Sequence, residues 1–326
     1  MKALQLTAYD GPSALRLVDV PEPTAGGDEV VLDVRAIGIN YPDLLITTGR
    51  YQMKPPLPFV PGSEVAGTVA YAPPGCDLAV GDRVAAFVWA GGFAERVSVP
   101  LNAVLPLPAS MDFVTSAATI INYHTVHFAL SRRGRLSAGE TLLVLGAAGG
   151  IGSAAVQVGK ALGARVLAGV ANEEQVSAAQ EAGADGVLVL TEGFAAQVRD
   201  LTEGRGVDVV LDPLGDWLFA EALRAIAPEG RILIVGFAAG SIPQLGINRL
   251  LLKNIAAVGV AWGAFLDIDR TLMATAGREI AAMHAAGRLR PLVAGNFDFE
   301  HIPEALELLS RGEIRGKAVV EVPPTA

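Results

Sequence analysis

The chain has 326 residues, of which 51% are hydrophobic and 18% are charged, and its formal net charge is −9. At roughly 150 residues per domain this length predicts two domains, and the composition excludes a disordered chain. The negative charge and the lack of any run of Lys or Arg argue against nucleic acid as a partner, because such binding requires neutralised phosphates. Cys76 is the only cysteine, which excludes an internal disulfide framework and a thiolate metal cage.

Two uncharged stretches, 113–131 and 141–159, approach the ~20 residues of a membrane-spanning helix. The first contains several polar side chains and the second contains five glycines. Strands buried on both faces of a parallel sheet also appear as continuous apolar runs, so we expect no membrane span. The amino terminus lacks the basic-then-apolar layout of a secretory signal, and we expect a cytoplasmic location.

Residues 1–110 have the pattern of short strands separated by turns. The segments "EVVLDVRAIGIN" and "EVAGTVAYA" are rich in Val, Ile and Thr, and two further apolar runs flank Gly91-Gly92. Proline and glycine recur between these segments, as turns require. The pattern predicts an all-β unit.

From about residue 123, apolar strands alternate with helical patterns. Six strands are expected, at 141–146, 164–170, 186–190, 206–215, 231–237 and 254–261. Such alternation predicts right-handed crossovers and a doubly wound parallel sheet. The tail adds helices near 268–287 and 302–311 and a closing strand, "KAVVEV".

The glycine-rich segment "LGAAGGIG" follows the first of these strands and opens a helix. It fits the dinucleotide fingerprint, with Ala147 in place of the first glycine. Gly149 would let a pyrophosphate approach the backbone, and Gly152 would let the helix lie close to the strand. The free N–H groups of Gly150 and Ile151 would donate to phosphate oxygens. The segment therefore predicts a dinucleotide site.

The second strand of the repeat bears on the choice of nucleotide. NAD-selective folds place an acid about 20 residues beyond the glycines, where it accepts from the ribose 2′-hydroxyl. Here that strand ends at Asn172, with no acid before Glu173 and no basic residue beside it. This favours NADPH and leaves NAD(H) as the alternative.

At this point the sequence resembles a known family. The segment "GETLLVLGAAGGIGSAAVQVGK" closely resembles the signature of the zeta-crystallin-like quinone oxidoreductases, a zinc-free branch of the medium-chain dehydrogenase/reductase superfamily. Further segments resemble the family in the same order: "GINYPDLL", "PFVPGSEVAG", "VGDRV", "AATIINYHTVHFAL" and "NRLLLKN". The resemblance covers essentially the whole chain.

The resemblance implies a fold, an activity and an assembly. It implies a GroES-like β-rich catalytic domain at 1–122, completed by 264–326, and a six-stranded Rossmann domain at 123–263. It also implies an NADPH-linked reductase of quinones or other conjugated carbonyls, and a homodimer joined through the last Rossmann strand. An apolar edge strand is a liability unless it is paired, which agrees with that assembly.

The resemblance also predicts that no zinc is bound. Zinc-dependent relatives have Cys and His at the positions of Asn40 and Ser63, and the remaining acids, Asp43 and Glu64, make a poor zinc site. Without a Lewis acid, hydrogen-bond donors must meet the charge that arises on the substrate oxygen.

Individual site residues follow by matching positions. Asn40 and Tyr51 match catalytic positions near the nicotinamide, and Tyr41 is a further candidate. The cofactor positions that match are Thr125, Gly236, Phe237 and Lys317. Gln175 and Leu190 replace the lysine and tyrosine with which many members hold the 2′-phosphate, so the preference for NADP over NAD stays open. His124 and His127 are expected to serve packing, not catalysis.

We therefore expect a reductase that moves a hydride from the nicotinamide, in an apolar cleft between its domains, to a quinone or to another small conjugated carbonyl. Two alternatives remain. One is a 2-enal or enoyl-thioester reductase, and the other is a nucleotide-binding protein without turnover.

Overall fold

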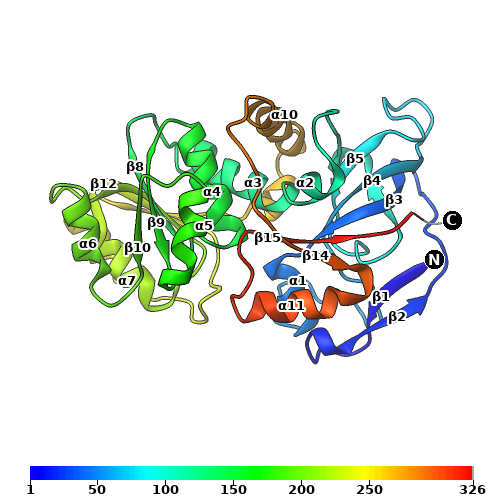
Figure 1. Cartoon of the computed structure of the whole chain (residues 1–326), viewed down its shortest axis with the longest axis horizontal. Helices are drawn as coiled ribbons and strands as arrows, with labels where there is room; N and C mark the ends of the chain where they lie inside the picture. The colour runs from blue at the N-terminus through cyan, green and yellow to red at the C-terminus, as the bar shows by residue number, and fades with distance from the viewer. Residues whose placement is uncertain (325–326) are drawn as a thin grey trace. The chain divides into compact units, whose positions relative to one another are not determined.

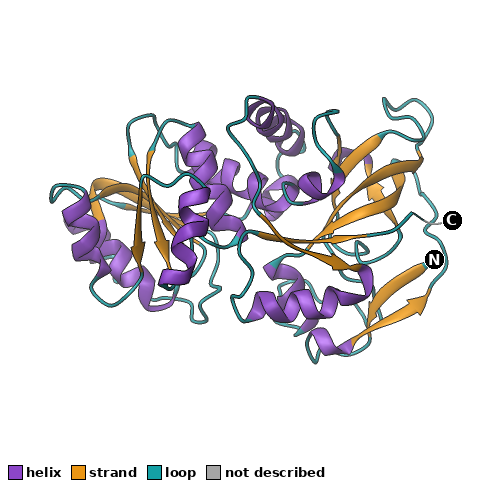
Figure 2. Ribbon diagram, viewed as in Figure 1, coloured by secondary structure: helices purple, strands orange, loops and turns teal. Residues whose placement is uncertain are grey.

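The computed structural model describes residues 1–324. The chain divides into two compact units, the first formed by Met1–Ile121 with the segment from Val293 onward, and the second by Asn122–Leu292. Each unit contains its own sheet, drawn as orange arrows in Figure 2.

The first unit is built mainly from short antiparallel strands. β1 (Lys2–Leu6) and β2 (Leu15–Asp19) form a separate hairpin, and a seven-stranded sheet has the order β14-β15-β3-β4-β5-β7, with β6 also paired to β3. The strands of this sheet are β3 (Glu29–Gly38), β4 (Glu64–Tyr71), β5 (Arg83–Phe87), β6 (Arg96–Pro100), β7 (Val104–Pro106), β14 (Val293–Asp298) and β15 (Lys317–Glu321).

Within residues 1–110, the helix α1 (Tyr41–Thr47) interrupts the predicted all-β pattern. The unit also contains α2 (Phe113–Ala117) and, in the tail, α11 (Ile302–Ser310), where a helix was expected near 302–311. Asn40 and Asp43 form a capping box at the start of α1, which satisfies backbone N–H groups that the helix leaves unpaired. A seven-residue helix has too few turns to show a clear helical period, so the sequence pattern did not reveal it.

The carboxyl-terminal strand lies inside the sheet of the first unit. β15, red in Figure 1, pairs antiparallel with the blue β3 and parallel with β14. Ile302 and Leu306 of α11 are fully buried in the same apolar core as Leu32 and Ile37 of β3. The segment from Val293 onward therefore completes this unit.

The second unit contains a six-stranded, wholly parallel sheet of order β10-β9-β8-β11-β12-β13. This confirms the predicted Rossmann topology. Its strands are β8 (Thr141–Leu145), β9 (Arg165–Val170), β10 (Gly186–Val189), β11 (Val207–Asp212), β12 (Ile226–Ile234) and β13 (Ala256–Gly259). Its helices are α3 (Ile120–His127), which begins in the first unit, α4 (Gly150–Ala161), α5 (Val176–Glu181), α6 (Phe194–Leu201), α7 (Asp216–Ala225), α8 (Asn248–Lys253), α9 (Trp262–Leu266) and α10 (Leu272–Ala285).

Helices cover both faces of this sheet (Figure 2). Leu143 and Leu145 of β8 belong to the apolar cluster that also contains residues of α6 and α7. Their neighbour Leu142 points to the opposite face, where Gly159 of α4 approaches it so closely that a Cβ there would lie 2.7 Å from the leucine. Burial on both faces explains why the strands appear as continuous apolar runs.

Residues 264–292, which the sequence assigned to the first domain, group with the second unit. Polar contacts hold this segment there. Gln157 of α4 donates from Nε2 to the Arg290 carbonyl at 2.7 Å and accepts from the Arg290 N–H at 2.7 Å. His127 Nε2 and Glu279 Oε2 are 2.8 Å apart.

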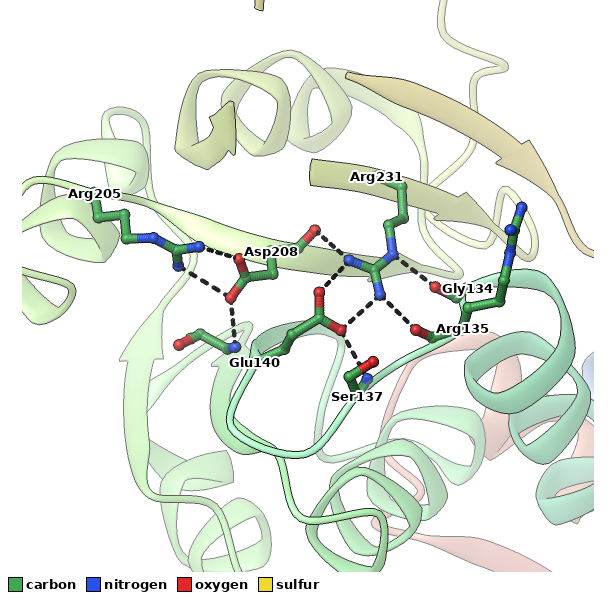
Figure 3. A network of polar contacts seen from close by, with 8 residues as sticks. Gly134, Arg135, Ser137, Glu140, Arg205, Asp208 and Arg231 are labelled. Atoms are coloured by element: carbon green, nitrogen blue, oxygen red, sulfur yellow. Dashed lines mark hydrogen bonds and ion pairs between the residues drawn. The ribbon is translucent and has the colours of Figure 1, made fainter. Parts of the chain in front are cut away.

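A charged network joins the strands near their amino ends (Figure 3). Arg231 of β12 forms an ion pair with Glu140 at 2.5 Å and donates to the carbonyls of Gly134 and Arg135 at 2.6 and 2.9 Å. Asp208 of β11 pairs with Arg205 and accepts from the Thr141 N–H at 2.8 Å. These bonds hold Glu140 and Thr141, at the start of β8, against β11 and β12.

Neither uncharged stretch forms a spanning element. Residues 113–131 fold into α2, α3 and the start of a π-helical turn, and residues 141–159 form β8 and most of α4. Among residues 1–324, no helix has the length and apolarity needed to cross a membrane.

Candidate functional site

The turn between β8 and α4 is the first candidate site. β8 ends at Leu145, Gly146 takes φ +66°, and α4 begins at Gly150 with Gly149 as its N-cap residue. No side chain caps this helix end, so the first N–H groups of α4 are available to a ligand. The helix dipole adds partial positive charge at the same place.

Two glycines of this turn differ in the space around them. A Cβ on Gly152 would lie 2.0 Å from the Gly146 carbonyl oxygen, so only glycine fits there. A Cβ on Gly149 would meet nothing nearer than that oxygen at 3.5 Å. Gly152 is therefore required by the packing of the protein itself, whereas the protein leaves the space beside Gly149 open.

The side chains around the turn fit the same interpretation. Ala147 is fully buried, and its N–H donates to the Gly169 carbonyl of β9 at 2.9 Å. Ile151 is partly exposed in the first turn of α4. The predicted residues Ala147, Gly149, Gly150, Ile151 and Gly152 are brought together at the carboxyl end of the first strand, where doubly wound sheets bind nucleotides.

The end of β9 carries no charged ligand for a 2′-phosphate at the two expected positions. Gln175 Oε1 accepts from the Ala171 N–H at 3.0 Å. Leu190 is buried and packs on Gly169, where an added Cβ would lie 2.6 Å from its side chain. Asn172 is exposed and lies two residues after the end of the strand.

The loops after β11 and β12 lie against each other. Ala238 N–H donates to the Pro213 carbonyl at 3.0 Å, and the Phe237 ring lies so near Gly215 that a Cβ there would be 2.9 Å from it. Gly236 and Phe237 thus lie at the same carboxyl edge of the sheet as the glycine turn.

Asp212, at the end of β11, organises these loops and was not singled out from the sequence. Its Oδ1 accepts from the N–H groups of Leu214 and Gly215 at 2.9 and 2.8 Å. Burial raises the pKa of this carboxyl above its ordinary value. An acid that closes an apolar strand, immediately before "PLG", is the signal that could have identified it.

Thr125 lies in α3 and is 9% exposed. Its neighbours His124 and His127 contact other residues of the second unit. The His124 ring lies 5.7 Å from that of Trp262, and His127 contacts Glu279.

The second candidate site is a buried polar cluster in the first unit, formed by Asn40, Asp43, Ser63, Glu64 and Lys317, each 5% exposed or less. Lys317 Nζ donates to Asn40 Oδ1 and to Glu64 Oε2, both at 2.5 Å. The first residue of β15 therefore joins the loop before α1 to the first residue of β4.

Every side-chain oxygen of the two acids in this cluster already accepts a hydrogen bond. Glu64 also accepts from the Ile121 N–H at 2.8 Å and from Asn40 Nδ2 at 3.0 Å. Asp43 accepts from Ser63 Oγ at 2.7 Å and from the Asn40 N–H at 2.9 Å. Burial raises the pKa of Asp43 to about 6, although the bonds from Ser63 and Asn40 and the charge of Lys317 oppose that shift.

The Asn40 amide is held on every side. Its Nδ2 donates to Glu64 and to the Gly38 carbonyl, at 3.0 and 3.1 Å, while its Oδ1 accepts from Lys317. A substrate oxygen would reach an Asn40 N–H only by sharing or replacing one of these bonds. Lys317, expected from the resemblance among the cofactor residues, is bonded to Asn40 and Glu64 instead of lying on the surface.

The two tyrosines have different surroundings. Tyr41 is the first residue of α1 and packs against the core of the first unit. Tyr51 follows α1 and is partly exposed. Burial, and secondarily the charge of Asp43, raise the pKa of Tyr51, so its hydroxyl remains protonated and able to donate.

The buried cluster does not fit a zinc ion. The nitrogen and sulfur ligands that zinc sites use are missing at positions 40 and 63, and the Lys317 ammonium lies against Glu64. Among the residues that the structure describes, no three His, Cys, Asp or Glu side chains are grouped so that they could hold a metal ion.

Two protein-family models match the chain, and each match falls within one of the two compact units. Residues 26–109 match the model of the alcohol dehydrogenase GroES-like domain, and residues 150–277 match that of the zinc-binding dehydrogenases. A quinone oxidoreductase-like protein 2 homolog of Nematostella vectensis is 36% identical over 300 residues, which cover 90% of this chain and 82% of that protein.

Solved structures agree along the whole length. A probable oxidoreductase from Mycobacterium abscessus superposes with a TM-score of 0.91 at 43% identity and covers 99% of both chains. The quinone oxidoreductase of Escherichia coli, solved in complex with NADPH, has a TM-score of 0.92 at 25% identity, with 99% of this chain and 100% of that chain covered.

Proposed function

Because this chain belongs to the quinone oxidoreductase family of the medium-chain dehydrogenase/reductase superfamily, and is therefore an oxidoreductase, we propose that it reduces quinones or other small conjugated carbonyls with NADPH. The observation that supports the proposal most directly is the contrast between Gly149 and Gly152. The protein's own packing explains why Gly152 has no side chain, and the open space beside Gly149 would admit a pyrophosphate.

The residues of the second unit would hold the cofactor. The N–H groups of Gly150 and Ile151 would donate to the pyrophosphate, Asn172 would lie at the ribose, and Thr125, Gly236 and Phe237 would position the nicotinamide. When bound, the dihydronicotinamide supplies a hydride, and this chain contributes binding, orientation and electrostatics. NAD(H) remains the alternative, because Gln175 and Leu190 offer no cation to a 2′-phosphate.

The first unit would serve the substrate without zinc. Tyr51, kept protonated by its raised pKa, would donate to the oxygen on which negative charge develops. Asn40 would share one amide N–H with the same oxygen while Lys317 holds its carbonyl end in place. Tyr41 would line the same side of the site.

A stopped-flow experiment tests the reaction class. The protein is mixed with NADPH or NADH and with 1,4-naphthoquinone, acrolein or crotonyl-CoA, and absorbance at the nicotinamide band is followed. Rapid oxidation with the quinone is expected. A preference for crotonyl-CoA or acrolein would assign an enal or enoyl-thioester reductase, and tight NADPH binding without oxidation by any acceptor would contradict catalysis.

We also propose that the protein is a homodimer joined through β13. This strand is the edge of its sheet and is largely exposed. Pairing two such edges would satisfy their free backbone groups. Light scattering should give twice the chain mass, and Ala257→Pro, which removes an N–H that points away from β12, should give the monomer. The cytoplasmic location stays a prediction.

A further inference from the structure

A pocket of about 360 Å³ lies in the second unit where α7 ends and α8 passes by. Four of its lining residues are cations: Arg199, Arg224, Arg249 and Lys253. The other three are apolar: Leu223, Leu252 and Ile255. Among the residues that the structure describes, no carboxylate lines this pocket.

Two of the cations have a role in the fold. Lys253 Nζ donates to the carbonyls of Leu223, Arg224 and Ile226, each at 3.2 Å, and so closes the carboxyl end of α7. The Arg224 side chain forms an ion pair with Glu221, a buried acid of the same helix.

The other two cations, Arg199 and Arg249, make few polar contacts within the part of the chain that the structure describes. Arg199 commits one N–H, from Nη1 to the Arg224 carbonyl at 3.2 Å. The Arg249 guanidinium makes no hydrogen bond or ion pair to any residue between 1 and 324. Nine of the ten guanidinium N–H groups of this pair are therefore open to a ligand.

Positive charge gathers here against the trend of the molecule. The chain as a whole carries −9, yet these four cations share one pocket, and the one acid paired with them is Glu221, which contacts Arg224. Burial lowers the pKa of Lys253, and repulsion from the charge of Arg199 lowers it further. A bound anion would relieve that repulsion.

We propose that this pocket binds a small organic phosphate whose head contacts Arg199 and Arg249 and whose short apolar chain lies against Leu252 and Ile255. Guanidinium groups present paired donors that match phosphate oxygens. The apolar lining selects an ester that carries an alkyl group over the bare ion. The site is separate from the glycine turn after β8, and the inference does not depend on the proposed reaction.

Calorimetric titration of the full chain at low ionic strength tests the proposal with three probes: octyl phosphate, inorganic phosphate and octanol. Octyl phosphate should bind saturably and at least tenfold more tightly than inorganic phosphate, and octanol should not saturate. The double variant Arg199→Gln/Arg249→Gln should weaken octyl phosphate at least tenfold. Leu252→Asn should weaken octyl phosphate and leave inorganic phosphate unchanged.

Two controls distinguish this pocket from a general effect of charge and from the nucleotide turn. Arg278→Gln/Arg311→Gln removes the same amount of charge elsewhere and should bind like the unmodified protein. Gly149→Val should also bind octyl phosphate normally, because its change lies at the nucleotide turn. The proposal is overturned by a dissociation constant weaker than about 10 mM, by unchanged binding in the Arg199/Arg249 variant, or by lost binding in Gly149→Val.

Discussion

The contrast between Gly149 and Gly152 predicts that a substitution at the first removes cofactor binding, whereas a substitution at the second lowers stability. In Gly149→Val the new Cβ meets nothing nearer than 3.5 Å, and the backbone there is in the extended region, with φ −84° and ψ 178°. The fold should therefore lose at most about 1 kcal/mol, the difference between good and poor N-cap residues. The valine methyl groups would fill the space intended for the pyrophosphate.

Gly152→Ala should behave in the opposite way. Its Cβ would lie 2.0 Å from the Gly146 carbonyl oxygen and 2.6 Å from the Cα of Ala147, so the helix or the strand must move. Overpacking of this kind costs about 1–3 kcal/mol. At about 2–4 °C per kcal/mol for a unit of this size, the melting temperature should fall by several degrees.

Thermal unfolding with and without NADPH measures both effects. A ligand at 100 times its dissociation constant stabilises the native state by about 2.7 kcal/mol, which corresponds to a rise of about 5–11 °C in the unmodified protein. Gly149→Val should unfold near the unmodified melting temperature and show no rise. An undiminished rise in that variant, or an unchanged melting temperature in Gly152→Ala, would refute the assignment of the two glycines.

Three further predictions concern charged groups. Lys317→Met or Glu64→Gln alone leaves a buried charge unpaired and should lower the free energy of unfolding by about 3–5 kcal/mol. The double variant should recover part of this loss, and urea titrations measure both effects. Asp43 has a folded-state pKa of about 6 against an ordinary 3.8, so its contribution to the free energy of unfolding is present below pH 4 and is lost as the pH rises through 6. The free energy of unfolding of Asp43→Asn, relative to that of the unmodified protein, should therefore rise by about 3 kcal/mol over that interval. A constant difference would contradict the raised pKa of Asp43. Arg231→Met should lower the free energy of unfolding by about 1.5–3 kcal/mol because several charge-assisted bonds are lost. Arg205→Met removes a side chain that is 61% exposed and should lower it by at most about 1 kcal/mol. Equal losses would contradict the different roles of Arg231 and Arg205 in the network of Figure 3.

Local sequence signals predicted the second unit well. Apolar strands and helical stretches alternate regularly there, and short crossovers permit few arrangements, so both the doubly wound parallel sheet and the place of the glycine turn followed from the pattern. The short helix α1 was missed, because seven residues that begin with a capping box show little periodicity. β14 was also missed, since its pairing with β15 follows from contact between distant segments.

The buried cluster shows a different limit. The sequence marked Asn40, Asp43 and Glu64 as residues left where other proteins bind zinc, but local pattern offers no way to learn that Lys317 reaches them. That contact joins positions 277 residues apart. Only the pairing of β15 with β3 brings the ammonium to the amide, and strand pairing over such a separation leaves no periodic signal in the sequence.

The place of β15 has a consequence for biosynthesis. Because this strand lies between β3 and β14, the first unit lacks an interior strand of its sheet until Lys317–Glu321 have been translated. The second unit contains every strand of its own sheet by Gly259 and can form while the ribosome is still adding the remainder. The part of the chain made first is thus finished last, and a nascent chain halted before Lys317 would present an open β-edge to chaperones.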